Sequence, residues 1–278
     1  MKRSIDLTIA AAPMIDDGDL LLYRALPGPE RNAVGPFVFL DHYRTQSLRG
    51  LGDAAHPHAG IELLSYLLEG SMEHRDSMGF RDRLVSGDAQ WIRAGRGMLH
   101  AEQPLSGRHG LQLWASLPAT QRFAAPAYAS WRSTQLPLIE QPGATVRVVA
   151  GPVGGVVGVA AFATPTTFAH IRLQPGASVE LDVDPDAELG AYVVDGAMAG
   201  SDGRRLPPGS LAILTPGDSV QLASAAEQAA DIALIGGRRA ERPILFSGPF
   251  VMSTREELLR ARRDFLSGAM GRLDAVPF

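Results

Sequence analysis

An internal repeat restricts the possible folds more than any other feature of the sequence. Residues 56–70 read HPHAGIELLSYLLEG and align with residues 182–196, which read DVDPDAELGAYVVDG. Further along, GDAQWIRAGRG begins at Gly87, and a similar segment, GSLAILTPGDS, begins at Gly209. Because the two segments keep their order in both halves, the chain is expected to contain two copies of one domain.

Both copies consist of short apolar runs that are closed by Gly, Pro or Asp. Examples are ELLSYLLEG, LQLWASLP, TVRVVAG and LAILTPGD. Strands of about five to eight residues with such punctuation are typical of β-sandwiches and β-barrels. We therefore predict an all-β fold of two tandem barrels, residues 1–130 and residues 131–278. The Pro-rich segment from Pro118 to Pro142 is the expected connection.

One helix is expected near the C-terminus, in the segment TREELLRARRDFLSG. Ser253 or Thr254 can cap its first turn, in which acidic side chains also favour the positive end of the helix dipole. The apolar residues that recur at roughly helical spacing are Leu258, Leu259, Phe265 and Leu266. We expect this apolar face to pack on a barrel.

Composition limits the kind of partner. The chain has 26 Lys and Arg against 30 Asp and Glu, a net charge of −4, and no basic block, so we do not expect it to bind nucleic acid directly. It has no Cys, which excludes disulfides and thiolate ligands. No apolar run approaches the ~20 residues of a membrane helix. We expect a cytoplasmic protein that binds a small molecule, and possible binding of a protein partner is left open.

Two pairs of side chains carry the metal-binding chemistry: His56 with His58, and His100 with Glu102. Alternate residues of a strand face the same side, so each pair can act as a two-pronged clamp. Two neighbouring strands could turn three imidazoles and one carboxylate toward one point. Such a ligand set suits Fe, Mn, Ni, Cu or Zn.

The second copy lacks these side chains. Asp182 and Asp184 align with the first His pair, and the position of His100 falls near Val220. A lone His-x-His is common outside metal sites, but packing alone gives no reason for four such residues to disappear together. The sequence therefore predicts a metal site in the first copy and a metal-free second copy.

Several segments resemble the pirin family of bicupins, which belongs to the cupin superfamily. The segments that carry the resemblance are HPHAGIELLSYLLEGSMEHRDSMG, GDAQWIRAGRGMLHAE, GLQLWASLP and GPFVMSTREEL. It extends from GPFVFLDHY near residue 35 to the C-terminal helix. The resemblance implies a bicupin of two jelly-roll barrels.

The resemblance also implies a function. The positions that match the family's metal ligands are His56, His58, His100 and Glu102, and Fe or a similar divalent metal is implied. Many pirins are described as quercetin 2,3-dioxygenases, which cleave flavonols with O2, and others as metal-dependent transcriptional coregulators. In a dioxygenase, Glu102 could be a catalytic base as well as a ligand. An enzyme acting on another small metabolite is a third possibility.

Four further residues near these motifs bear on the candidate site. Ala59 and Ile61 stand where the family usually has Arg and Phe, which leaves the substrate open. Glu62 lies one residue from the carboxylate position of many cupins, so we favour Glu102 as the ligand and expect a salt bridge or an indirect role for Glu62. His74 could orient a ligand by a hydrogen bond. Its charged neighbours instead favour a solvated strand face.

Overall fold

The computed structural model describes residues 1–200 and 204–273. In these ranges the regular elements are β-strands, with two exceptions. These are the 3-10 turn η1 (Ser133–Gln135) and the helix α1 (Arg255–Leu266). The all-β prediction is confirmed. Residues 201–203 and 274–278, which belong to the second predicted domain, lie outside the described residues.

The chain forms two compact units that alternate along the sequence. The first, here called the apolar unit, comprises Met1–Ala12, Tyr23–Phe37 and Thr134–Arg239. The second, here called the histidine unit, comprises Pro13–Leu22, Val38–Ser133 and Ala240–Phe278. The division after residue 130 stays a prediction for the folding domains. The compact units differ from it because each combines segments from both predicted domains.

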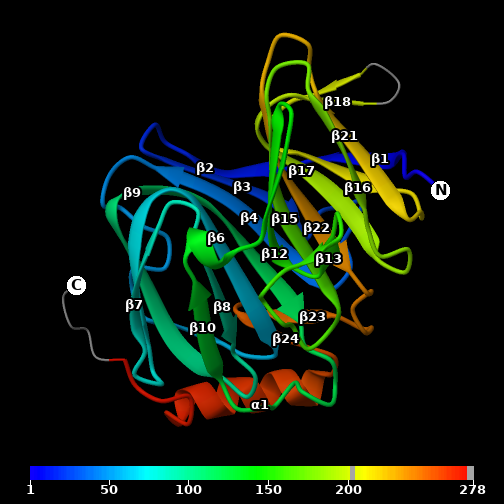
Figure 1. The fold of residues 1–278 in the computed structure, drawn as a ribbon. Helices are drawn as coiled ribbons and strands as arrows, with labels where there is room; N and C mark the ends of the chain where they lie inside the picture. The colour runs from blue at the N-terminus through cyan, green and yellow to red at the C-terminus, as the bar shows by residue number, and fades with distance from the viewer. Residues whose placement is uncertain (201–203, 274–278) are drawn as a thin grey trace. The chain divides into compact units, whose positions relative to one another are not determined.

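A nine-stranded sheet carries most of the histidine unit, in the order β10-β8-β6-β9-β4-β3-β2. The long strands β6 and β9 run side by side at its centre (Figure 1). Two short strands extend the sheet: β5 pairs with β9, and β7 pairs with β6. The bounds are β2 Ala12–Asp16, β3 Leu20–Leu26, β4 Phe37–Thr45, β5 His56–His58, β6 Ile61–Asp76, β7 Arg81–Val85, β8 Ala89–Arg93, β9 Met98–Ser116 and β10 Ala127–Trp131.

The apolar unit contains a seven-stranded sheet in the order β1-β20-β17-β22-β15-β12-β11, a four-stranded sheet in the order β16-β21-β18-β19, and the pair β13-β14. The bounds are β1 Ile5–Ala10, β11 Leu138–Gln141, β12 Ala144–Ala150, β13 Pro152–Val153, β14 Val156–Val157, β15 Thr166–Leu173, β16 Ser178–Asp182, β17 Glu188–Gly196, β18 Met198–Ala199, β19 Arg205–Leu206, β20 Ser210–Leu214, β21 Ser219–Ser224 and β22 Ala230–Gly237.

The core of the apolar unit is filled with aliphatic side chains. Leu181 and Val183 are buried in it, whereas Asp182 between them is exposed, as strand alternation requires. Val220, near the position aligned with His100, is buried in the same cluster. Among the described residues, the groups of three or more side chains that could hold a metal draw only on the histidine unit.

Strand pairing confirms the internal repeat. β6 lies between β8 and β9, and β17 lies between β20 and β22. Tyr66 of β6 is opposite Ala89, and Tyr192 of β17 is opposite Leu211. Ala89 and Leu211 occupy the same place in the two aligned segments that follow Gly87 and Gly209. The aligned residues therefore have equivalent neighbours in the two sheets.

The C-terminal helix α1 begins as the sequence predicts. Thr254 is its N-cap and forms a capping box with Glu257. The helix lies beside the paired strands β23 (Leu245–Ser247) and β24 (Phe250–Met252) (Figure 1). The expected apolar face packs only in part. Leu258 lies against the cluster that contains Ala261, and the Phe265 ring meets the Phe250 ring at 6.3 Å. Leu259 and Leu266 are exposed, and Ala261 is the one buried residue of the helix.

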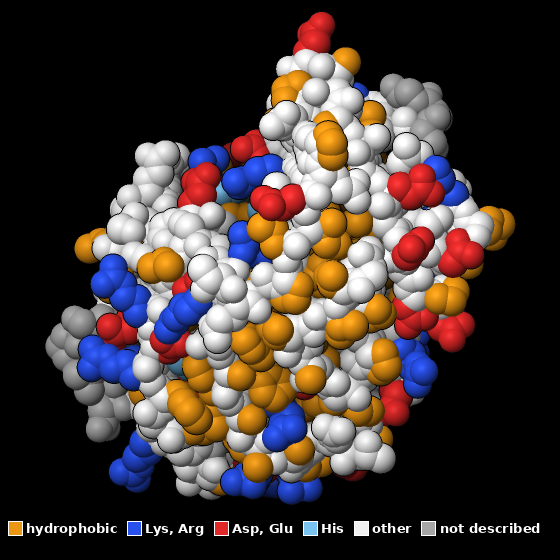
Figure 2. Space-filling model, in the orientation of Figure 1, with side chains coloured by type: hydrophobic (Ala, Val, Ile, Leu, Met, Phe, Trp, Pro, Cys, Tyr) orange, Lys and Arg blue, Asp and Glu red, His pale blue; other side chains and the backbone are white. Residues whose placement is uncertain are grey.

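The described surface has charges of both signs. Figure 2 shows Lys and Arg side chains together with Asp and Glu side chains on the face drawn there. Among the described residues, no helix is both long enough and apolar enough to cross a membrane.

Candidate metal centre

Three adjacent strands bring the candidate ligands together. β5 pairs with β9 so that His56 is opposite His100. β6 pairs with the other edge of β9, placing Asp76 opposite His100 and His74 opposite Glu102. Opposed residues of antiparallel strands project to the same face. The register therefore gathers five polar side chains from three strands into one small region of the histidine unit.

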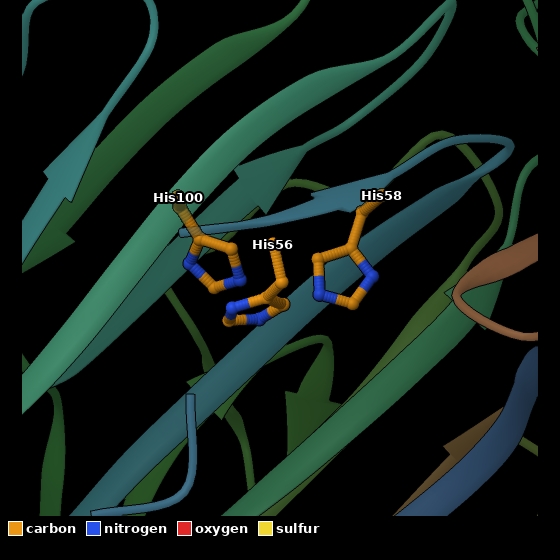
Figure 3. Close-up of side chains that lie close together, drawn as sticks. All are labelled: His56, His58 and His100. Carbon is orange, nitrogen blue, oxygen red and sulfur yellow. The ribbon is translucent and has the colours of Figure 1, made fainter. Parts of the chain in front are cut away.

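Three imidazoles converge in this region. The ring centroids of His56 and His100 lie 4.3 Å apart, and each lies 5.0 Å from the centroid of His58. One ring nitrogen from each residue lies within 4.8 Å of the other two. Figure 3 shows the three rings turned toward one another beside the β5 and β9 backbone. The i, i+2 spacing thus places the His56 and His58 rings close enough to act on one ion.

The hydrogen bonds of these rings fit a metal ion. His56 Nδ1 lies 2.9 Å from the Ala54 carbonyl oxygen, which can only accept, so Nδ1 carries the proton and Nε2 keeps its lone pair. Both ring nitrogens of His100, and Nδ1 of His58, are buried without a hydrogen-bond partner. Buried polar atoms without partners are costly. A cation would supply the missing partner for the nitrogens that face the cluster.

The protonation state of the rings fits as well. Burial, followed by repulsion from His56, lowers the pKa of His58 to about 3. Burial is also the largest cause of the lowering of the His100 pKa well below its ordinary value of 6.5, and neighbouring His56 adds to it. Both rings are therefore neutral near pH 7, which is the form that binds a metal.

Glu102 lies beside the three imidazoles and is itself buried. One carboxylate oxygen is 3.7 Å from His100 Nδ1 and accepts a hydrogen bond from the Gln90 side-chain amide. The other oxygen lies 3.4 Å from Arg108 Nη1. Glu102 groups with His100 and His74, so His100 is common to both sets of candidate ligands.

Glu62 lies outside both sets. It is buried, and its carboxylate accepts a hydrogen bond of 3.2 Å from the indole N–H of Trp91. The structure therefore brings Glu102, and not Glu62, together with the imidazoles. The one-residue displacement noticed in the sequence is enough to separate the two carboxylates.

The expectation of a solvated face at His74 is wrong. The His74 side chain is 0% exposed, and its ring stacks on Tyr128 with centroids 4.5 Å apart. The cause is the position of this part of β6, which pairs with β7 on one edge and with β9 on the other. The charged residues on either side of His74 suggested exposure to solvent, but they pair with each other. Arg75 Nε lies 2.7 Å from Glu73 Oε1.

Sequence reasoning also missed the residues that surround the candidate ligands. Gln90 and Arg108, the two partners of Glu102, are both buried. Trp114 lies 4.9 Å from the His58 ring, stacks on Phe39 at 3.9 Å, and has a buried indole N–H without a partner. The sequence did offer one signal for Gln90: it is a single polar residue between the apolar residues of a short strand, a pattern that indicates a polar side chain facing the interior.

A glycine supports His56 from the loop before β5. Gly52 has a φ of +80°, and a Cβ atom there would lie 2.8 Å from Cε1 of His56. Its carbonyl accepts a hydrogen bond of 2.8 Å from the Glu102 amide. The same loop is held at Leu51, whose carbonyl accepts from the Arg108 guanidinium at 2.5 Å. The loop is thus tied to the strand that carries Glu102.

The two positions at which the sequence departs from the family pattern are both buried. Ala59 and Ile61 are 0% exposed, and Ala59 packs in a cluster with Phe250 and Met252. The missing Arg and Phe side chains therefore change packing next to β5, at the strand that holds two of the imidazoles.

Comparison with known proteins identifies the family. The profile named Pirin matches residues 20–115, and the Pirin C-terminal cupin domain matches residues 168–271. Human pirin is 33% identical over 276 residues, which cover 97% of this chain and 94% of the relative. The chain belongs to the pirin family. The resemblance found in the sequence is confirmed, and so is its bicupin fold.

Two solved structures place this pirin among its relatives. A quercetin 2,3-dioxygenase from Acinetobacter baumannii superposes with a TM-score of 0.87 at 27% identity, covering 99% of this chain and 100% of that one. A bacterial pirin from Escherichia coli, solved with nickel(II), superposes with a TM-score of 0.64 at 17% identity, covering 84% and 99%. The second likeness concerns the fold alone.

Proposed function

We propose that this pirin is a metal-dependent dioxygenase that cleaves flavonols such as quercetin with O2. The observation that carries the proposal is the convergence of His56, His58 and His100 beside the carboxylate of Glu102, with unpartnered buried ring nitrogens on His58 and His100. The likeness to the Acinetobacter baumannii enzyme supports the substrate class. An unreactive packing cluster would not leave so many buried nitrogens without hydrogen bonds.

In this proposal, His56, His58, His100 and Glu102 hold one metal ion. Three imidazoles and a carboxylate suit Fe, which we propose as the resident metal, and the same donors accept Mn, Ni, Cu or Zn. When bound, the metal would act as a Lewis acid on the substrate's hydroxyl oxygen and would supply the redox chemistry for reaction with O2. The protein positions the ligands, and burial keeps the His58 and His100 rings neutral.

Glu102 is the proposed base for the substrate's hydroxyl proton. Gln90 donates to one carboxylate oxygen, and the Arg108 guanidinium lies 3.4 Å from the other. These two neighbours hold the carboxylate in place while the proton is transferred.

Aromatic side chains next to His58 support a planar substrate. Trp114 is half-buried and stacks on Phe39 with an interplanar angle of 8°. Its ring also meets the His58 ring edge to face, at 74°. Stacked aromatic surfaces favour flat aromatic ligands.

The absence of Cys is compatible with the reducing cytoplasm to which we assign the protein.

The test is anaerobic purification with metal analysis, followed by oxygen uptake with a panel of flavonols. We expect one metal per chain, flavonol-dependent oxygen consumption, and loss of both in His56→Ala. A protein that binds one metal and consumes no flavonol would contradict the dioxygenase proposal. That result would favour the coregulator function implied for other pirins, to be tested by metal-dependent capture of a protein partner.

A further inference from the structure

A buried His–Asp pair lies next to the candidate ligands and has no part in the function proposed above. His74 Nε2 is 3.1 Å from Asp76 Oδ2, and both side chains are 0% exposed. The other oxygen of Asp76 accepts the backbone amides of Met78 at 2.9 Å and Phe80 at 3.0 Å. These two amides fix the carboxylate so that Oδ2 faces His74.

This arrangement determines where the His74 proton lies. A carboxylate oxygen accepts hydrogen bonds, so His74 Nε2 carries the proton and donates it to Asp76. Nδ1 of His74 then keeps a lone pair, yet it is buried and has no hydrogen-bond partner. Because buried acceptors are normally hydrogen-bonded, His74 Nδ1 is expected to accept a hydrogen bond from a neighbouring donor.

The donor can be identified from the neighbouring groups. A ring nitrogen of His74, a ring nitrogen of His100 and a Glu102 oxygen lie within 4.8 Å of one another. The Glu102 oxygens already face the N–H groups of Gln90 and Arg108. His100 has two unpartnered nitrogens, and a neutral imidazole bound to a metal through one nitrogen carries its proton on the other.

We propose that His74, oriented by Asp76, accepts the N–H of His100 and so keeps the other nitrogen of His100 available to the metal. This inference rests on the metal centre proposed above. The His74 and His100 centroids lie 5.7 Å apart. For comparison, the His42 and His109 rings have centroids 5.0 Å apart and ring nitrogens at 2.7 Å. The His74 and His100 centroids are 0.7 Å farther apart, so the two rings must approach by that amount for an equally short contact.

Asp76→Asn tests this role without changing the shape of the side chain. The amides of Met78 and Phe80 still require an oxygen, so the new NH2 group must face His74 Nε2. That nitrogen then has to accept, which moves the His74 proton to Nδ1 and opposes the N–H of His100. Partners of metal-bound His typically change metal affinity by about 10–100-fold, and we expect a loss of that size here.

Two substitutions of His74 separate its two nitrogens. The side-chain oxygen of His74→Asn can replace Nδ1, whereas the amide of His74→Gln replaces Nε2 and loses the acceptor facing His100. We expect His74→Asn to retain more metal affinity than His74→Gln. Asp231→Asn is the matched control, because Asp231 Oδ1 lies 3.1 Å from His170 Nε2 in the apolar unit. It should leave metal affinity unchanged.

The readouts are the dissociation constant for Co(II), the absorption spectrum of the Co(II) protein, and the tautomer of His74 by 15N NMR of the apo protein. We expect Nε2–H in the wild type, Nδ1–H in Asp76→Asn, and a shifted Co(II) spectrum in that variant. If the wild type binds metal and both Asp76→Asn and His74→Gln bind it with the same affinity, this inference is overturned and the proposed function is not. A wild-type protein that takes up no metal would overturn the proposed function as well.

Discussion

Gly52→Ala should weaken metal binding through His56, and the structure gives the size of the effect. The added Cβ would lie 2.8 Å from the imidazole carbon Cε1, whereas ordinary contacts begin at 3.4 Å. The ring or the loop must therefore shift by about 0.6 Å, which exceeds the ~0.5 Å within which a site has to be held. We expect metal affinity to fall at least about tenfold, or ~1.4 kcal/mol.

The same substitution also strains the backbone, so a control is needed. Gly52 has a φ of +80°, and an Ala in this region costs about 1–2 kcal/mol. Gly18 has a φ of +88° with no atom within 4 Å of its added Cβ. Both Ala variants should lose similar stability in urea unfolding of the apo protein, but only Gly52→Ala should lose metal affinity in a chelator competition. Equal metal affinities in the two variants would refute the reasoning.

Three further predictions concern the site, the helix and pH. His100→Ala should abolish metal uptake while leaving the β-sheet circular-dichroism spectrum intact, because the apolar unit has an apolar core and, among its described residues, no group of candidate metal ligands. Thr254→Ala removes the capping box of α1 and should lower the free energy of unfolding by about 1 kcal/mol, measured in urea. Burial, then the nearby charges of His109 and Arg44, lowers the pKa of His42 from 6.5 to about 3. Below pH 6.5 the unfolded chain therefore binds a proton at His42 that the folded chain does not bind. As the pH is lowered from 6.5 to 3, the free energy of unfolding should fall by up to about 1.4 kcal/mol per pH unit. His42→Asn should reduce this slope.

The parts of the site that depend on local geometry could be predicted from the sequence. Each i, i+2 pair lies on one strand, so the shared face of His56 and His58 follows from strand alternation alone. The meeting of His56 with His100 does not, because it depends on the pairing of β5 with β9. The resemblance to pirins supplied that long-range information.

The errors have a common physical cause. His74 lies beyond two irregularities in the pairing of β6 with β9, near Leu67 and near Met72. Such bulges change which face a residue occupies, and the sequence gives no signal of them. The helix cap was predictable because capping involves neighbouring residues, whereas the buried face of α1 depends on what packs against it.

The most direct test of this account is a crystal structure of the metal-loaded protein with anomalous diffraction data at the absorption edge of the bound metal. The account predicts one strong anomalous peak, within bonding distance of His56, His58, His100 and Glu102. A peak located in the apolar unit, or a histidine cluster that stays empty at saturating metal, would contradict it.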